Sequence, residues 1–138
     1  MEIIYDLDDI SAIAKRIVSL IQEYKVITFT GDLGAGKTTL INSICKVLGV
    51  KEIVSSPTFA IIQEYRANDN LIYHMDLYRL KNVQEAIDAG VEDCLLSGEL
   101  CLVEWPEKAK GLFAGESISI SLESLSANRR KLLVQLPQ

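Results

Sequence analysis

The sequence predicts an α/β fold of three layers, in which helices cover both faces of a central sheet of mixed parallel and antiparallel strands. Three observations predict it: a glycine-rich loop at residues 31–38 between a strand and a helix, a turn at residues 67–70 too short for a crossover helix, and further apolar strands that alternate with helical segments. The length of 138 residues is that of one domain, and we expect residues 1–138 to form it.

The loop has the sequence GDLGAGKT and fits the phosphate-binding pattern G-x-x-x-x-G-K-S/T at every fixed position. Apolar, β-branched residues at 26–30 predict a buried strand before it, and residues 39–48 predict a helix that ends at Gly49. Backbone N–H groups of such a loop surround phosphate oxygens, Lys37 is placed to reach the β- and γ-phosphates, and the Thr38 hydroxyl is placed to ligate Mg²⁺. The sequence therefore predicts a P-loop NTPase-like domain, and the flanking strand and helix disfavour an incidental glycine turn.

The other elements follow from apolar spacing and turn residues. A first helix is expected to run from a cap at Asp8 or Asp9 to about Tyr24. Asn82 is expected to cap a short helix, with Glu85 reaching back to the cap. The remaining expected elements are strands at 59–65, 71–75 and 100–103, helices at 83–89 and 91–96, a C-terminal hairpin of 117–122 and 132–136, and a turn at the basic run 129–131.

Two acids stand directly after expected strands. Asp76 follows the strand at 71–75, and Glu104 follows the strand at 100–103. Hydrolysis at a P-loop needs a carboxylate at the end of a neighbouring strand, to hold Mg²⁺ or to orient water. The alternative for each is a surface acid that begins a loop, and the P-loop in the same chain favours the catalytic interpretation.

Three further features have two interpretations each. His74, the only histidine, lies on the same strand face as Asp76, and a satisfied, half-buried histidine is favoured over a catalytic one. Residues 55–58 are either a plain connection or a switch segment that senses the γ-phosphate. Trp105 is either part of the core or an anchor beside a partner or the nucleotide.

Composition excludes some classes of protein. The net charge is −5, and only residues 129–131 form a basic cluster, which disfavours direct, strong binding of DNA or RNA. No apolar run approaches the ~20 residues that cross a membrane, and the acidic N-terminus is not a secretory signal. The three cysteines show no C-x-x-C spacing, which indicates reduced core thiols in a cytosolic protein.

Four runs taken together carry a resemblance to a known family. They are GDLGAGKTT at 31–39, SPTF at 56–59, HMDLYR at 74–79 and LVEWPE at 102–107. In this order and at this spacing they resemble the TsaE (YjeE-like) family, the small bacterial ATPases of tRNA threonylcarbamoyladenosine biosynthesis. The P-loop alone is unspecific, whereas the combination in so short a chain is highly specific.

The resemblance implies a cytoplasmic ATPase with weak intrinsic turnover that uses ATP/ADP and Mg²⁺. It implies two partners, a threonylcarbamoyltransferase subunit and its non-catalytic paralogue, with tRNA contacted only through them and with no membrane or DNA. It implies catalytic roles for Asp76 and Glu104 and metal binding by Thr38 and Glu104. The nucleotide-binding residues that it implies are Asp32, Leu33, Gly34, Ala35, Gly36, Lys37, Thr38, Thr39 and Trp105, whereas no role transfers to Arg130 in the divergent C-terminal hairpin.

Other functions of a P-loop chain are less well supported. A small-molecule kinase brings several arginines over the phosphates, and the five arginines here are scattered. A GTPase usually carries an Asn-Lys-x-Asp run, which this sequence lacks. A non-catalytic ATP-binding module stays open as an alternative.

Overall fold

The computed structural model describes residues 1–52, 54, 55, 57, 60–113, 115 and 117–137. Its elements, in chain order, are β1 (Glu2–Asp6), η1 (Leu7–Asp9), α1 (Ile10–Leu20), β2 (Val26–Thr30), α2 (Lys37–Leu48), β3 (Ile62–Ala67), β4 (Asn70–Asp76), α3 (Val83–Asp88), α4 (Val91–Leu96), β5 (Leu100–Glu104), η2 (Pro106–Leu112), β6 (Ser117–Ser124) and β7 (Arg129–Gln135), where η marks a 3₁₀ helix. None of the described helices is both long enough and apolar enough to cross a membrane.

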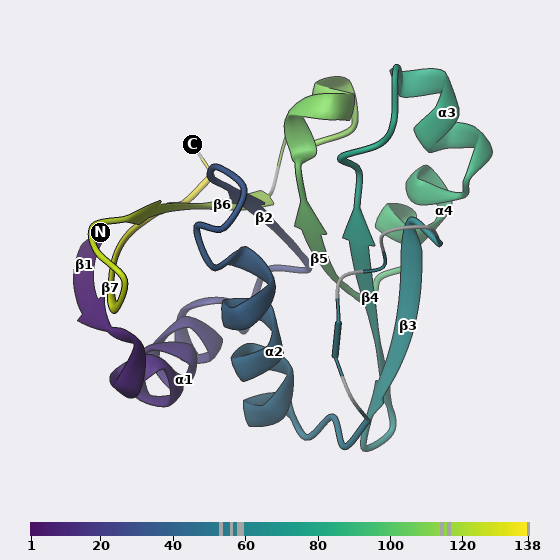
Figure 1. The fold of residues 1–138 in the computed structure, drawn as a ribbon. Helices are drawn as coiled ribbons and strands as arrows, with labels where there is room; N and C mark the ends of the chain where they lie inside the picture. The colour runs from purple at the N-terminus through teal and green to yellow at the C-terminus, as the bar shows by residue number, and fades with distance from the viewer. Residues whose placement is uncertain (53, 56, 58–59, 114, 116, 138) are drawn as a thin grey trace.

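The strands form one seven-stranded sheet in the order β1-β7-β6-β2-β5-β4-β3, so the chain's first and last strands lie together at one edge (Figure 1). The central strands β6, β2, β5 and β4 are parallel, and β3 and β7 pair antiparallel at the two sides of this centre. The predicted mixed sheet is confirmed. Because the carboxyl ends of parallel strands share one edge of a sheet, β2, β4 and β5 deliver their following residues to the same place.

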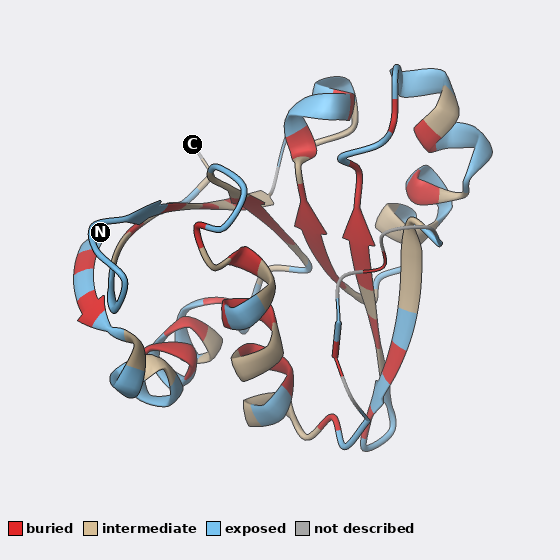
Figure 2. Cartoon of the chain, viewed as in Figure 1, coloured by how far each residue is buried: buried red, intermediate tan, exposed pale blue. Residues whose placement is uncertain are grey.

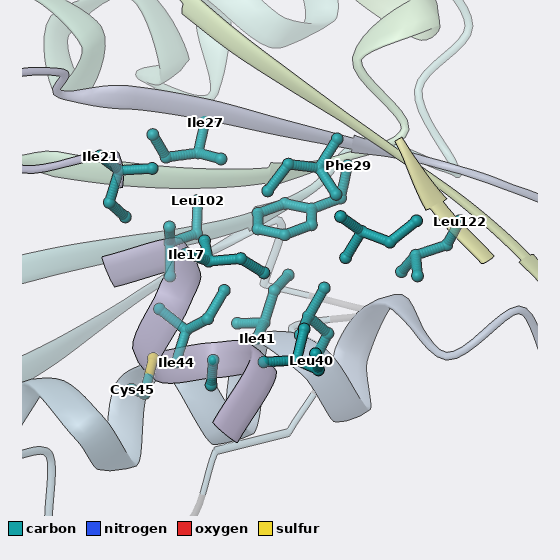
Figure 3. Close-up of a cluster of buried hydrophobic side chains, with 14 of the residues drawn as sticks. Ile17, Ile21, Ile27, Phe29, Leu40, Ile41, Ile44, Cys45, Leu102 and Leu122 are labelled. Carbon is teal, nitrogen blue, oxygen red and sulfur yellow. The ribbon is translucent and has the colours of Figure 1, made fainter. Parts of the chain in front are cut away.

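Helices cover both faces of the sheet, as the three-layer prediction requires. On one face, α1 and α2 pack on the larger apolar cluster, in which Phe29 of β2 and Leu102 of β5 meet Ile17 and Ile41 (Figure 3). On the other face, α3, α4 and η2 cover a second cluster that includes Val103. The period-two alternation of Leu102 and Val103 sends adjacent side chains to opposite layers, and both layers are covered, so β2 and β5 are buried along most of their length (Figure 2).

Several predicted boundaries need correction. The first helix ends at Leu20 rather than near Tyr24, and the N-terminal strand β1 was not predicted. The strand expected at 59–65 runs instead from Ile62 to Ala67. It cannot begin earlier, because Ile61 has a φ of 65°, which a strand does not allow. Residue 59 lies outside the described residues. The basic run 129–131 opens β7 instead of marking a turn.

The predicted hairpin and helix cap are confirmed with small adjustments. β3 and β4 pair antiparallel, and the turn between them is reduced to Asn68 and Asp69. The side chain of Asn82 accepts a hydrogen bond from the backbone N–H of Glu85 at 2.9 Å. The Glu85 carboxylate accepts from the N–H of Lys81 at 3.3 Å, one residue before the cap. The helices at 83 and 91 therefore begin where their sequence signals predict.

Candidate nucleotide site

The glycine-rich loop connects β2 to α2 in a conformation that requires glycine. Gly31 has a φ of 149°, and a Cβ atom there would lie 2.5 Å from the carbonyl oxygen of Leu122 on β6. Gly36 has a φ of 101° at the start of α2. A side chain at Gly31 would collide with the backbone of β6, and a side chain at Gly36 would be strained by the positive φ, so the loop requires glycine at both positions.

The loop forms one wall of a cleft with a volume of about 480 Å³. Every residue predicted for the nucleotide, the metal or catalysis lines this cleft, although the residues come from the loop between β2 and α2, from α2, from the ends of β4 and β5 and from the residue after β5. The cleft is lined by Asp32, Leu33, Gly34, Ala35, Gly36, Lys37, Thr38, Thr39, Asp76, Tyr78, Arg79, Glu104, Trp105 and Arg130.

Lys37 is held over the loop from several sides. Its ammonium donates hydrogen bonds to the carbonyl oxygens of Gly31 and of Asp32, the latter at 3.3 Å. The nitrogen also lies 3.8 Å from the ring centroid of Trp105, a cation–π contact. Burial lowers the pKa of Lys37, and the carboxylates of Glu104, Glu107, Asp76 and Asp32 oppose that shift. A phosphate in the cleft would add further negative charge that favours the ammonium.

Glu104 is a buried carboxylate with a partner on each oxygen. Its Oε1 accepts a hydrogen bond from the Thr38 hydroxyl at 2.9 Å, and its Oε2 lies 2.7 Å from Nε2 of His74. The Glu104 side chain is only 3% exposed. His74 is fully buried rather than half-buried, and the hydroxyl of Tyr65 lies 3.1 Å from its other ring nitrogen. The structure therefore confirms a satisfied strand histidine that does not line the cleft.

Asp76 and Trp105 complete the end of the sheet. Asp76 is opposite Glu104 in the β4–β5 register, and its Oδ1 accepts the N–H of Tyr78 at 3.0 Å. Trp105 has a φ of 59°, and its indole packs against the Tyr78 ring at a centroid distance of 4.8 Å. The tryptophan is thus a wall of the cleft. Of the predicted switch segment 55–58, residues 56 and 58 lie outside the described residues.

Arg130 reaches the cleft from β7, and no role for it transferred from the sequence. Its Nη1 donates to the carbonyl oxygens of Ser126 at 2.8 Å and of Arg129 at 3.0 Å. Its Nε is buried, has no hydrogen-bond partner among the described residues, and lies 3.3 Å from where a Cβ of Gly36 would stand. The basic run was visible in the sequence, but its approach to the loop depends on the pairing of β7 with β6.

The oxygen atoms of the cleft fit Mg²⁺. The Thr38 hydroxyl and the carboxylates of Glu104 and Asp76 are ligands that this ion prefers. The Thr38 hydroxyl donates its hydrogen bond to Glu104, and its oxygen keeps lone pairs for a metal. Among the described residues, no group of three or more His, Cys, Asp or Glu side chains could hold a metal ion. Mg²⁺ usually keeps several waters and shares its coordination with substrate phosphates, and one hydroxyl and two carboxylates suit such an ion.

Comparison with known proteins gives a consistent answer. The family described as "Threonylcarbamoyl adenosine biosynthesis protein TsaE" matches residues 4–132. A protein of that name from Rickettsia conorii is 38% identical over 89% of this chain and 70% of its own length, and one from Bacillus subtilis is 35% identical over 91% and 78%. The crystal structure of Bacillus subtilis YdiB superimposes with a TM-score of 0.76 and 28% identity, covering 100% of this chain and 87% of that one. The fold is P-loop NTPase-like, as predicted.

Proposed function

The chain belongs to the TsaE family of threonylcarbamoyl adenosine biosynthesis proteins, and from this membership we propose that it binds ATP with Mg²⁺ and hydrolyses it slowly in support of that tRNA modification. The observation that carries the proposal is the contact between the P-loop and a strand-end acid: the Thr38 hydroxyl on α2 donates to Glu104 at the end of β5. This contact joins the phosphate-binding loop to a carboxylate suited to hydrolysis.

Each side chain of the cleft has a distinct role in this proposal. The loop N–H groups and Lys37 bind the phosphates, and the Thr38 hydroxyl ligates the metal while it continues to donate to Glu104. Mg²⁺, when bound, neutralises charge on the β- and γ-phosphates. Glu104 would help to hold the ion, and with Asp76 it would orient the attacking water. Trp105 covers Lys37 and limits the access of bulk water to it.

We propose that the ATPase works with a threonylcarbamoyltransferase and its non-catalytic paralogue, which hold the tRNA. The net charge of −5 and the presence of only one tight basic cluster, at residues 129–131, support a subunit that does not bind tRNA alone. A role in tRNA modification supports a location in the cytoplasm.

The first test is nucleotide binding by the Lys37→Ala variant. We expect affinity for Mg-ATP to fall at least ~100-fold, because the variant loses the cation at the phosphates. Isothermal titration calorimetry measures the loss, and Lys46→Ala, an exposed lysine on the same helix, is the matched control that should bind normally. Equal affinity of wild type and Lys37→Ala would contradict a nucleotide site at this loop.

The second test separates hydrolysis from binding. Glu104→Ala should lower ATP turnover in the presence of the partners by roughly 10²–10³-fold while binding changes little, and Glu92→Ala on α4 should leave both unchanged. If wild-type protein with its partners turned over no ATP, or if Glu104→Ala and Asp76→Ala were both silent, the chain would be a non-catalytic ATP-binding module. Recovery of neither transferase subunit with the tagged chain in the presence of ATP would contradict the proposed complex.

A further inference from the structure

A chain of buried polar groups runs from the nucleotide cleft into the sheet. The Thr38 hydroxyl lies 2.9 Å from Glu104 Oε1, and Glu104 Oε2 lies 2.7 Å from His74 Nε2. His74 Nδ1 lies 3.1 Å from the Tyr65 hydroxyl, which in turn lies 3.2 Å from the carbonyl oxygen of Ser55. The chain therefore crosses from α2 to β5, β4 and β3 and ends on the backbone of Ser55, the first residue of the predicted switch segment.

The inner members of this chain cannot touch a ligand in the cleft. His74 and Tyr65 are 0% and 1% exposed, and neither lines the cleft. They share the α1–α2 face of the sheet with apolar residues of the larger cluster, such as Ile72 of β4 and Leu102 of β5. An apolar side chain at either position would avoid the cost of burying a polar group, so the packing of this face does not by itself account for them.

The geometry defines what His74 does to Glu104. An ionised carboxylate accepts hydrogen bonds only, so the Nε2–H group of the imidazole donates a hydrogen bond to Oε2. With Oε1 held by Thr38, both oxygens are fixed, and the plane of the carboxylate is fixed with them. Each oxygen retains a further lone pair for a water or a metal ligand in the cleft.

Tyr65 in turn fixes the imidazole ring. Its hydroxyl has one proton and two acceptors in reach, the Ser55 carbonyl and Nδ1 of His74. Whether the hydroxyl donates to Nδ1 or accepts from it, the contact keeps Nε2 directed at Glu104. The same arrangement, in which a partner of the second ring nitrogen sets the orientation of the first, is used where histidines hold metals or catalytic groups.

We propose that His74 and Tyr65 are positioning residues for ATP hydrolysis, which hold Glu104 in the orientation that activates water. The inference rests on the proposed ATPase function, and it gives a role in the reaction to two buried residues that do not line the cleft. The side chains act only through Glu104, so they should affect the rate of the chemical step and leave nucleotide affinity unchanged.

The decisive variant is Tyr65→Phe, which removes one hydroxyl and keeps the ring. In steady-state assays with the partners present, we expect kcat to fall about 5–10-fold, the effect of one neutral hydrogen bond, with KM and the calorimetric affinity for Mg-ATP within twofold of wild type. Tyr73→Phe is the matched control, because Tyr73 precedes His74 on β4 and packs with the cluster on the opposite face of the sheet. Its kcat should equal that of wild type.

A second variant tests the order of the chain. His74→Leu removes both ring hydrogen bonds and should lower kcat by about 100-fold, and adding Tyr65→Phe to it should lower kcat no further, because Tyr65 acts through the ring. If His74→Leu does not fold, the kcat of Tyr65→Phe alone tests the positioning role.

The outcomes separate this inference from the proposed function. If wild-type protein hydrolyses ATP and Tyr65→Phe does so at the full rate, the positioning role is wrong and the ATPase stands. A raised KM with an unchanged kcat also overturns the positioning role. If wild-type protein hydrolyses no ATP, both fail.

Discussion

Acidic and basic side chains are buried at the parallel centre of the sheet and exposed at its antiparallel margin. At the carboxyl end of the centre, Lys37, Glu104 and His74 are each at most 5% exposed. In the margin formed by β1 and β7, Arg129 pairs with Asp6 at 3.1 Å and Lys131 pairs with Glu2 at 3.2 Å, with every one of these side chains at least 40% exposed. The two regions thus hold ionisable groups at similar distances in different surroundings.

The difference in burial determines how strongly these charged groups interact with one another and with a ligand. Exposed pairs are screened by water and salt, so those of the margin contribute little beyond favouring the β1–β7 register. Buried groups lose hydration, and their interactions with one another and with a ligand are stronger at the same separation. The loss of hydration destabilises the buried groups, and these groups lie at the carboxyl end of the parallel strands, beside the P-loop.

The largest expected difference between the two regions is in packing. Phe29 on β2 is 0% exposed and Ile4 on β1 is 52% exposed. We expect Phe29→Ala to lower the free energy of unfolding by about 3–5 kcal/mol, because it leaves a cavity against α1 and α2, and Ile4→Ala to lower it by less than about 1 kcal/mol. Urea denaturation measures both. Similar losses for the two variants would mean that the margin is as tightly packed as the centre.

A smaller effect should appear as pH dependence. Burial raises the pKa of Cys45 on α2 and of Cys101 on β5 from 9.0 to about 12. Above pH 9 the unfolded chain loses these protons and the folded chain keeps them, so the contribution to stability is complete below pH 9 and is lost as the pH rises towards 12. The slope should reach about 1.4 kcal/mol per pH unit for each thiol.

Denaturation at pH 8, 9, 10 and 11 under reducing conditions measures that slope. Cys45→Ala is the control. It should reduce the pH slope of the unfolding free energy by about the contribution of one thiol, whatever the substitution does to stability at pH 8. A wild-type profile that stays flat from pH 9 to 11 would show that these thiols ionise as easily in the folded protein as in the unfolded chain.

The smallest effect is the coupling across the marginal ion pairs. A double-mutant cycle of Lys131→Ala and Glu2→Ala should give about 0.2–1 kcal/mol, and 1 M NaCl should reduce it further. The same cycle of His74→Ala and Glu104→Ala in the centre should give about 1–3 kcal/mol with little dependence on salt. Equal couplings in the two regions would remove the electrostatic contrast between them.

The sequence predicts the residues of the site better than it predicts their neighbours. Lys37, Asp76 and Glu104 are recognisable because each sits next to a local signal, a glycine loop or the end of an apolar strand, and the parallel order of β2, β5 and β4 brings them together. Arg130 was not assigned, because its position depends on the pairing of β7 with β6, which no local pattern encodes.

The missed elements have similar physical causes. In β1 the exposed Ile4 stands between the buried Ile3 and Tyr5, and three apolar residues in succession hide the period-two pattern. The contact between Tyr65 and His74 is set by the register of β3 against β4, so the alternation of each strand gives the face but not the partner.

Trp105, held in a left-handed backbone conformation, provides a fluorescent probe of the site. It is the only tryptophan of the chain, and its indole lies against both the Lys37 ammonium and the Tyr78 ring. A ligand that draws Lys37 away from the indole changes the charge above the ring, and no second tryptophan contributes to the emission. The tryptophan emission of the unlabelled protein, excited at wavelengths that tyrosine does not absorb, therefore reports on this cleft.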